Sequence, residues 1–499
     1  MRLINHLKER YAVILSAIGL MLLLCSGLLV TPLLALFVWP DQMVHAPEFA
    51  MPAVILAMIG MMLWRFFRIR SFTPLSVQEG GLIVLTSWLI VIVFSAWPLM
   101  TILHLPFSRA LFESVSGWTT TGLSVVDVEV AGPLILLWRS IIQLAGGAGL
   151  AIMMMSALIG PTGIGISKAE GRGDQLVPQI RQSARLVLII YGTYAVSGVV
   201  AYYLAGMSLF DAINHSFAAV STGGFSTHTQ SIGYWDSPLI EAITLPLMFL
   251  GNLSFVTAWF LFRGKLLDVS MNGEIRLQAV LVPLSMVLFF LMTTQTLYPH
   301  LGKSIRVAIF EVMTAITTTG FSTVSYSQWN SFGINLLVIL MLIGGGVCST
   351  AGGIKQFRIY LLGKLVFWEF KRYISSPNAI LVRPIWEGGR RVFVDDDQIR
   401  QLTVFVSLYL ATFATGVLLL CAHGFSLESS LFEFASAMGT VGLSVGITSA
   451  QMPDSVLWAE IVAMFLGRLE ITMVFVSVFK LKRDAGLMVD VMKKKRKQT

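Results

Sequence analysis

Charged side chains are scarce in this chain of 499 residues, where Asp, Glu, Lys and Arg together make up 12% of the sequence. Soluble globular proteins carry roughly a quarter of their residues as charges. With 56% hydrophobic residues and a mean hydropathy of +0.78, the composition excludes an ordinary soluble protein. Apolar runs of about 20 residues recur along the chain, which predicts an all-α integral membrane protein with several spans.

Cysteine and histidine, the residues of many metal and catalytic sites, are also few. The three cysteines (Cys25, Cys348 and Cys421) lie inside apolar runs without metal-ligand spacing, so we expect them to be packing residues. None of the seven histidines is paired with Cys or Asp at a ligand spacing. A membrane-embedded enzyme needs such an arrangement or paired carboxylates, and we therefore do not expect an enzyme.

What the chain does contain is a long series of candidate spans. The first is too long for a secretory signal and lacks a small-residue cleavage site, so we expect it to be retained. The candidate spans are 11–38, 48–66, 77–103, 132–160, 184–206, 236–263, 276–298, 332–365 (interrupted), 400–423 and 455–480.

Basic residues account for the net charge of +8, and they are clustered. Every cluster falls on one side of the membrane if the N-terminus is cytoplasmic, as the positive-inside rule requires. The same rule places the C-terminus in the cytoplasm. Because membrane topology accounts for the basic residues, we do not expect a nucleic-acid partner. The clusters include Arg2/Lys8/Arg10, Arg65/Arg68/Arg70, Lys168/Arg172/Arg181/Arg185, Arg263/Lys265/Arg276, Lys371/Arg372/Arg383/Arg390/Arg391 and Lys480/Lys482/Arg483.

A polar pattern, T-x-G-[LF]-S, interrupts the apolar chain four times at intervals of roughly 100 residues. Each copy follows a short amphipathic run and lies between two candidate spans, on the outer side in the predicted topology. The copies are 120–124, 222–226, 318–322 and 440–444. A repeat of this length accommodates two spanning helices and a re-entrant segment.

Irregular backbone within a membrane must be buried in protein or line a water-filled path. Four copies therefore predict four re-entrant segments that meet on one axis with pseudo-fourfold symmetry. Glycine permits turns that align successive carbonyls, and a ring of carbonyls can replace the hydration shell of a monovalent cation. The preceding short helices would direct their partially negative C-terminal ends at the same place. The alternative is that these turns only pack helices together.

These segments, the leading helix pair and the stretch IGGGVCSTAGGIK at 343–355 resemble the Trk/Ktr/HKT superfamily of potassium transporters, in particular the membrane subunit of its bacterial Trk branch. The resemblance implies a K⁺ filter, and glycine at all four central positions implies potassium as the bound and transported ion. It also implies a homodimer in the bacterial inner membrane and a cytosolic nucleotide-binding (TrkA-like) regulatory ring. The implied filter residues are Thr120, Thr121, Gly122, Thr222, Gly223, Gly224, Thr318, Thr319, Gly320, Thr440, Val441 and Gly442.

The expected architecture is two leading helices followed by four repeats of helix, pore helix and return helix. We place the leading pair at 1–70 and the repeats at 71–165, 166–268, 269–370 and 400–484. A cytoplasmic loop at 371–399 separates the last two repeats, and a basic cytoplasmic tail follows at 485–499. The long loop is a candidate docking surface for the regulatory ring, or alternatively a plain solvated connection.

The glycine-rich stretch within 343–355 is a poor choice for a continuous helix, because each Gly costs about 1 kcal/mol relative to Ala. We expect a broken helix below the filter, and the family resemblance implies an intramembrane gating loop there. Close helix packing through small residues is the alternative. The candidate gate residues are Gly344, Gly345, Gly346, Gly352, Gly353 and Lys355.

Isolated charges inside apolar runs are costly and usually face a cavity or a partner. Arg468 is either an electrostatic barrier beneath the filter, as the family implies, or the partner of a carboxylate such as Glu470. Four further residues stand nine positions before the filter glycines, and they either attract cations or anchor the pore helices: Glu113, His215, Glu311 and Glu433. A proton- or sodium-coupled symporter on the same scaffold remains the alternative to an uncoupled pore.

Overall fold

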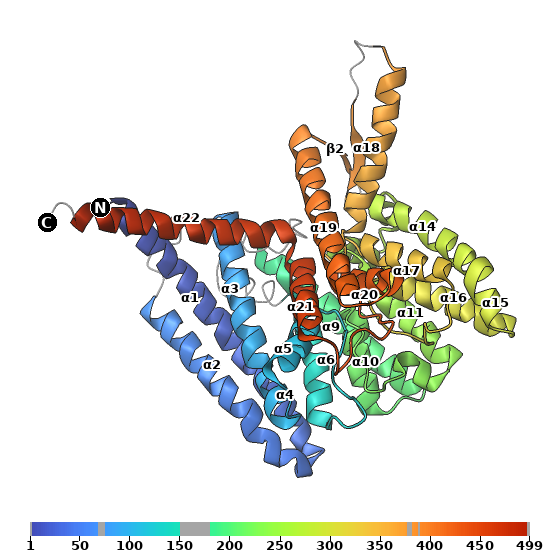
Figure 1. Ribbon diagram of the computed structural model, residues 1–499, viewed down its shortest axis with the longest axis horizontal. Helices are drawn as coiled ribbons and strands as arrows, with labels where there is room; N and C mark the ends of the chain where they lie inside the picture. The colour runs from blue at the N-terminus through green and yellow to red at the C-terminus, as the bar shows by residue number, and fades with distance from the viewer. Residues whose placement is uncertain (1, 68–74, 150–179, 377–381, 388–389, 497–499) are drawn as a thin grey trace.

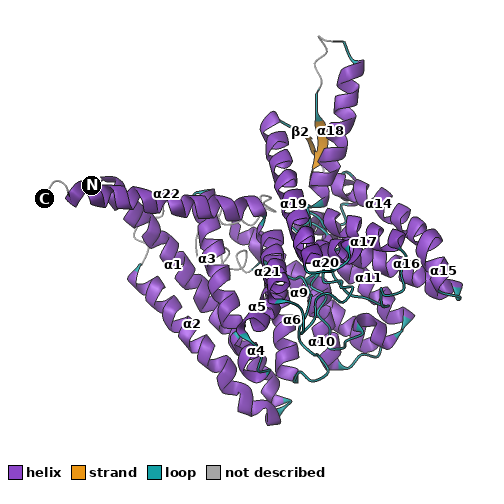
Figure 2. Cartoon of the chain, in the orientation of Figure 1, coloured by secondary structure: helices purple, strands orange, loops and turns teal. Residues whose placement is uncertain are grey.

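The computed structural model describes residues 2–67, 75–149, 180–376, 382–387 and 390–496 (Figure 1). Helices dominate these residues, and the strands form one small hairpin (Figure 2). The predicted all-α membrane fold is confirmed in these elements. The expected boundary between the first two repeats, at 165–166, and the end of the candidate span 132–160 lie outside the described residues.

The leading pair consists of α1 (Arg2–Val30) and α2 (Ala46–Phe66), joined by the short helices η1 (Thr31–Phe37) and η2 (Pro40–His45). The two long helices run side by side (Figure 1). They pack closely because Gly19 faces Gly60: a Cβ on Gly19 would lie 2.7 Å from the Gly60 carbonyl oxygen. Small residues at such crossings let backbones approach within a membrane.

Each of the four repeats contains a short helix that ends directly before the polar pattern. In repeat 1, α3 (Val77–Ser95) and α4 (Trp97–Ile102) lead to the pore helix α5 (Phe107–Trp118) and the return helix α6 (Pro133–Ala148). The pore helices of the other repeats are α10 (Leu209–Val220), α16 (Leu301–Ile316) and α20 (Leu427–Gly439).

The remaining elements complete repeats 2 to 4. Repeat 2 has α9 (Ile180–Leu204), η4 (Ser231–Trp235), α11 (Pro238–Asn252), α12 (Phe255–Phe262) and α13 (Leu266–Ser270). Repeat 3 has α14 (Gly273–Phe289), the π-helical turn η5 (Phe290–Thr294), α15 (Gln295–Leu297), α17 (Ser331–Ile343) and α18 (Gln356–Ile374). Repeat 4 has α19 (Asp396–Ala422), α21 (Asp454–Leu469) and α22 (Ile471–Arg496).

Among the described residues, six helices are long and apolar enough to cross a membrane, or eight if each bent helix pair is one span. The bends correct the prediction of continuous helices at 236–263 and 455–480. The first pair, α11 and α12, turns by 117° at Leu253–Ser254, and the second, α21 and α22, turns by 95° at Glu470. Together with the break after α17, the return helices of repeats 2, 3 and 4 are all interrupted.

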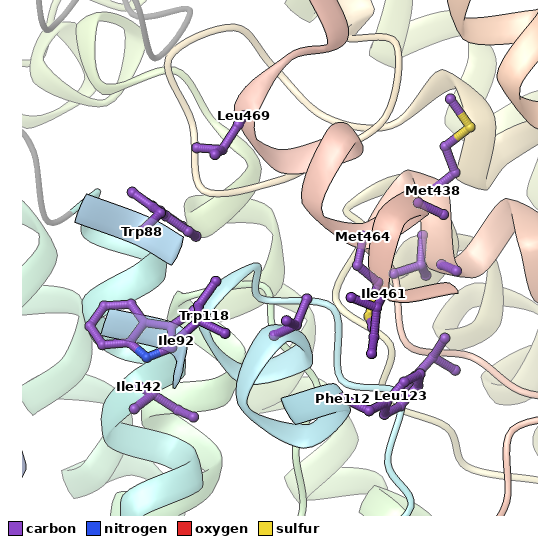
Figure 3. Close-up of a cluster of buried hydrophobic side chains, with 14 of the residues drawn as sticks. Trp88, Ile92, Phe112, Trp118, Leu123, Ile142, Met438, Ile461, Met464 and Leu469 are labelled. Carbon is purple, nitrogen blue, oxygen red and sulfur yellow. The ribbon is translucent and has the colours of Figure 1, made fainter. Parts of the chain in front are cut away.

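The pore helices are buried within the protein along most of their length. Figure 3 shows one part of the core, where Trp118 of α5 lies beside Trp88 of α3, and where Met438 of α20 lies near Met464 of α21. Trp118 is also fixed by a hydrogen bond from its indole N–H to Ser95 Oγ, 2.9 Å. The pore helix α5 also packs against α21, which joins the first repeat to the last.

The connection between repeats 3 and 4, where a long cytoplasmic loop is expected at 371–399, contains regular structure. Helix α18 continues to Ile374, and an antiparallel hairpin follows, formed by β1 (Pro384–Glu387) and β2 (Arg390–Phe393). The hairpin buries Ile385 in a small cluster with Leu361 of α18. Helices α18 and α19 and the hairpin project away from the rest of the chain on one side (Figure 1).

Candidate functional site

The four T-x-G-[LF]-S segments share one backbone conformation. The threonine that opens each segment has a positive φ of 50–55°, a rare conformation for a β-branched residue, and the segment glycines have φ of 73–102°. The residue between this threonine and the glycine donates its backbone N–H to a carbonyl of the preceding pore helix. Examples are Thr121 N–H to Ser116 O, 2.9 Å, and Val441 N–H to Ser436 O, 2.8 Å. Strain repeated at four equivalent places indicates a functional constraint.

The four segments meet in a closed ring. A Cβ on Gly122 would collide with the carbonyl oxygen of Gly223, the residue before the next segment glycine. The same collision occurs in the other repeats. A Cβ on Gly224 would meet Thr319 O, one on Gly320 would meet Val441 O, and one on Gly442 would meet Thr121 O, which closes the ring. Each glycine is therefore required by a backbone oxygen of the neighbouring repeat, which cannot move aside as a flexible side chain can.

A cavity of about 620 Å³ lies directly on this ring. The four glycines of the ring contribute to its lining, together with polar side chains such as Ser226, His228 and Ser322. On the far side of the ring, the hydroxyls of Thr222 and Thr318 meet the glycine-rich segment: Thr222 Oγ1 lies 3.0 Å from Thr350 Oγ1, and Thr318 Oγ1 accepts from Gly352 N–H at 2.8 Å. The ring thus separates a polar cavity from a packed loop.

The loop at 344–355 is irregular between α17 and α18, as expected for a broken helix. Gly344 and Gly353 have φ of 69° and 78° and lie against each other, and Gly345 N–H donates to Gly352 O at 3.0 Å. Lys355 Nζ donates to Ala351 O.

Residues of repeats 2 and 3 anchor this loop from outside. Gly346 N–H donates to Asn252 O at 3.2 Å, where the return helix of repeat 2 ends. The carboxylate of Glu274, at the start of α14, accepts from Val347 N–H at 2.7 Å. The loop is therefore a defined, hydrogen-bonded structure beneath the ring.

Arg468 reaches this loop from α21. Its guanidinium donates to the carbonyls of Thr350 in the loop and of Gly146 and Gly147 at the end of α6. Glu470, the carboxylate partner considered above, instead accepts two bonds from Arg358 of α18, at 2.9 and 3.0 Å. Arg468 therefore links the loop to repeat 1 beneath the ring.

The four residues nine positions before the ring glycines tether the backbone that leaves the ring. Glu113 Oε2 accepts from Val125 N–H at 3.0 Å, and Glu433 Oε2 accepts from Val445 N–H at 3.0 Å. Glu311 Oε1 accepts from Thr323 N–H at 2.9 Å, while His215 Nε2 lies 2.9 Å from Ser226 Oγ. All four side chains are fully buried, which favours the anchoring role over an exposed cation-attracting ring.

Arg139 is a functional candidate that the sequence reasoning missed. It is 2% exposed on α6, and its Nε donates to Glu113 Oε1 at 2.7 Å. It also donates to Ser226 O at 3.2 Å and lies 4.0 Å over the ring of Phe225, so it joins the first two segments. An arginine within the apolar run 132–160 was the available signal, because intramembrane charges usually have a specific partner.

Comparison with known proteins agrees with this arrangement. Residues 45–486 match the TrkH family, described as a cation transport protein. The chain is 32% identical to the Trk system potassium uptake protein TrkH of Halomonas elongata over 93% of this chain and 97% of that protein. For the protein of the same name in Escherichia coli, the values are 31%, 92% and 97%.

A solved structure shows the same fold. The crystal structure of the potassium transporter TrkH from Vibrio parahaemolyticus superimposes with a TM-score of 0.82 at 28% identity, and it covers 94% of this chain and 98% of that one. The family is one of transporters, in agreement with the expectation that the chain is not an enzyme. This multi-pass membrane chain belongs to the TrkH family of cation transport proteins.

Proposed function

We propose that this chain takes up potassium ions across a bacterial inner membrane through one central pathway. The observation that carries the proposal is the closed ring in which each glycine faces a carbonyl oxygen of the next repeat. Such a ring gathers backbone oxygens from four chain segments at the floor of a polar cavity. The relatives named as potassium uptake proteins support K⁺ as the ion.

In this proposal the ring is the ion filter, and K⁺ is both its ligand and its cargo. The carbonyl oxygens of Thr121, Gly223, Thr319 and Val441 replace water around the ion. The C-terminal ends of the pore helices add partial negative charge. The hydroxyls of Thr120 and Thr440 are buried without a hydrogen-bond partner among the described residues, which favours them as further oxygen ligands.

The loop at 344–355 is the proposed gate. Its contacts with Thr222 and Thr318 seat it against the inner side of the filter, and Arg468 holds it there with a positive charge close to the pathway. An ion leaving the filter therefore meets both packed backbone and an unfavourable charge. Opening requires the loop to leave this seat.

The gate proposal predicts that Gly345→Ala raises basal K⁺ flux. A Cβ there would collide with Ala351 Cβ and Asn252 Oδ1, so the closed loop is overpacked. Overpacking costs about 1–3 kcal/mol, which lowers the seated population roughly tenfold. The measurement is K⁺ efflux from liposomes. Gly363→Ala on α18, where a Cβ meets nothing within 4 Å, is the matched control and keeps wild-type flux.

Ion preference is the second measurement on the Gly345→Ala protein, since the filter itself is untouched. Its K⁺ over Na⁺ preference stays at the wild-type value. Wild-type flux in a folded Gly345→Ala protein would rule out the loop as a gate.

We also propose a homodimer, with both termini in the cytoplasm, that is controlled by a cytosolic nucleotide-binding ring. The start of α1 and the end of α22 lie on the same side as the projecting helices α18 and α19 (Figure 1). Phe370 and Tyr373 of α18 are exposed there, which suits a protein partner. Co-purification of the soluble ring, lost on replacing both aromatic residues by Ser, tests the docking site.

The experiment that tests the function is the reversal potential of the purified chain in planar bilayers, with K⁺ on one side and Na⁺ on the other. A reversal near the K⁺ equilibrium value supports an uncoupled, selective pathway. A reversal that follows an imposed proton or sodium gradient would instead identify a symporter. The regulatory ring is added with its nucleotides if the chain alone stays closed.

A further inference from the structure

The filter segment of repeat 2 differs from the other three at one position. Gly223 stands where the other repeats have Thr121, Thr319 and Val441, so that two glycines follow each other. Thr121 and Thr319 each fix their segment through a hydroxyl contact, with Thr119 Oγ1 at 2.7 Å and with Thr317 Oγ1 at 2.8 Å. Gly223 has no side chain for this purpose, and consecutive glycines are the most mobile backbone.

A side chain from the preceding repeat fills the space beside Gly223. A Cβ on Gly223 would lie 2.5 Å from Gln143 Cδ, 2.7 Å from its Oε1 and 2.8 Å from its Nε2. Gln143 belongs to α6 and is fully buried. The side chain of Gln143 occupies the space that a side chain at position 223 would need. Glycine at 223 and glutamine at 143 therefore depend on each other.

Gln143 makes two opposed hydrogen bonds to this segment. Its Nε2 donates to Gly223 O at 2.6 Å, and its Oε1 accepts from Phe225 N–H at 3.2 Å. The amide thus brackets Gly224, the ring glycine of this repeat. Only one orientation of the amide satisfies both partners, because rotation by 180° would oppose two acceptors and two donors.

The equivalent position in other repeats is apolar. Gly146, Gly251 and Gly467 each pack against the carbonyl of the corresponding pore-helix residue, Trp118, Val220 or Met438, and so mark the same place in three return helices. Gln143 stands three residues before the first of these glycines, and the corresponding residues are Met248 and Met464. Both methionines are fully buried. The amide is a departure from this apolar pattern.

We propose that Gln143 is a positioning residue that sets the preference of the filter for K⁺ over Na⁺. This inference rests on the proposed potassium pathway. Gly223 O is one of the four oxygens of the ring, facing Gly122 of repeat 1. A carbonyl oxygen has two lone pairs, so it accepts from Gln143 and still faces an ion.

The physical effect is on rigidity. Without the amide, the Gly223–Gly224 pair is free to rotate its carbonyl toward a smaller ion, and a filter that adapts to Na⁺ discriminates less. With the amide in place, the oxygen stays at the distance set by the other three repeats. Gln143 thereby does for repeat 2 what the threonine hydroxyl contacts do for repeats 1 and 3.

The test is the K⁺/Na⁺ permeability ratio of Gln143→Met and Gln143→Glu, taken from reversal potentials in bilayers. Gln143→Met introduces the residue of repeats 2 and 4, and Gln143→Glu keeps the size but removes the donor to Gly223 O. We expect the ratio to fall roughly fivefold in each, as for one lost hydrogen bond. Ser140→Ala is the control: it removes the bond to Asn214 Oδ1, 2.6 Å, on the same helix without touching the filter, and keeps the wild-type ratio.

A double variant provides the rescue. Gly223→Thr alone collides with Gln143, whereas Gln143→Met with Gly223→Thr recreates the pattern of repeats 1 and 3 and regains expression and a high ratio. A wild-type K⁺/Na⁺ ratio in folded Gln143→Met or Gln143→Glu overturns the proposal. So does a double variant that recovers neither expression nor the ratio. A wild-type chain without K⁺ selectivity would instead refute the potassium pathway itself, so the two failures are distinguishable.

Discussion

Gly320→Ala is expected to reduce K⁺ uptake to below about a tenth of the wild-type level and to lower K⁺ over Na⁺ discrimination by a similar factor. Gly320 has φ of 83°, which costs an alanine about 1–2 kcal/mol, and its Cβ would collide with Val441 O. The carbonyl must move, and it is a proposed ion ligand. Since 1.4 kcal/mol corresponds to a factor of ten, strain and displacement together account for the loss.

The control for this prediction separates backbone strain from collision. Gly446 has φ of 98°, and a Cβ on it meets nothing within 4 Å. Gly446→Ala therefore carries similar strain without disturbing the ring, and we expect its uptake and discrimination to stay near wild type. Uptake is measured in a bacterial strain that lacks its own potassium systems, and discrimination in bilayers. Equal losses in both variants would mean that the ring contact has no special role.

The ring itself could be predicted because its signal is local and repeated. The pattern at 120–124 recurs three times, and glycine, threonine and serine in an apolar chain have few structural explanations other than a re-entrant segment. The pore helices could be predicted for the same reason, because a short amphipathic run precedes each copy of the pattern. The cyclic order, in which repeat 4 closes onto repeat 1 through Gly442 and Thr121, is visible only in the structure.

The bends in the return helices were missed because their causes are distant in the sequence. The break at Leu253 follows Asn252, whose carbonyl accepts from Gly346 N–H, and the short polar interruption Gly251-Asn252 stands within a long apolar run. Only Ser254, which caps α12 by accepting from Thr257 N–H at 3.1 Å, marks a new helix start. At Glu470 the carboxylate pairs with Arg358, 112 residues away.

Gln143 shows the same limit at the level of one side chain. In the sequence it is one of three polar residues in an otherwise apolar helix, with Arg139 and Ser140, and nothing in the pattern names its partner. Its partner Gly223 lies 80 residues further along the chain. In the sequence, nothing distinguishes this glycine from the many others in the chain. The interlock between the two is a property of packing between repeats, and no pattern within either repeat contains it.

Arg468→Ala is expected to raise single-channel open probability roughly ten- to a hundredfold. The guanidinium donates to Thr350 O of the proposed gate and to the carbonyls of Gly146 and Gly147 at the end of α6. Hydrogen bonds from a charged donor contribute about 1.5–3 kcal/mol each. Losing one therefore shifts the closed–open equilibrium toward the open state by roughly ten- to a hundredfold. The removal of a positive charge beside the pathway acts in the same direction.

Arg468→Lys separates these two effects. Lysine keeps the charge but cannot bridge the gate and α6 with a planar fork of donors. If the bonds dominate, the lysine variant resembles the alanine variant; if the charge dominates, it resembles wild type. In both cases the K⁺/Na⁺ permeability ratio stays at its wild-type value, because the ring glycines and the Gln143 contact lie on the other side of Thr222 and Thr318. Currents in Arg468→Ala no larger than those of wild type would exclude Arg468 both as a latch and as a barrier.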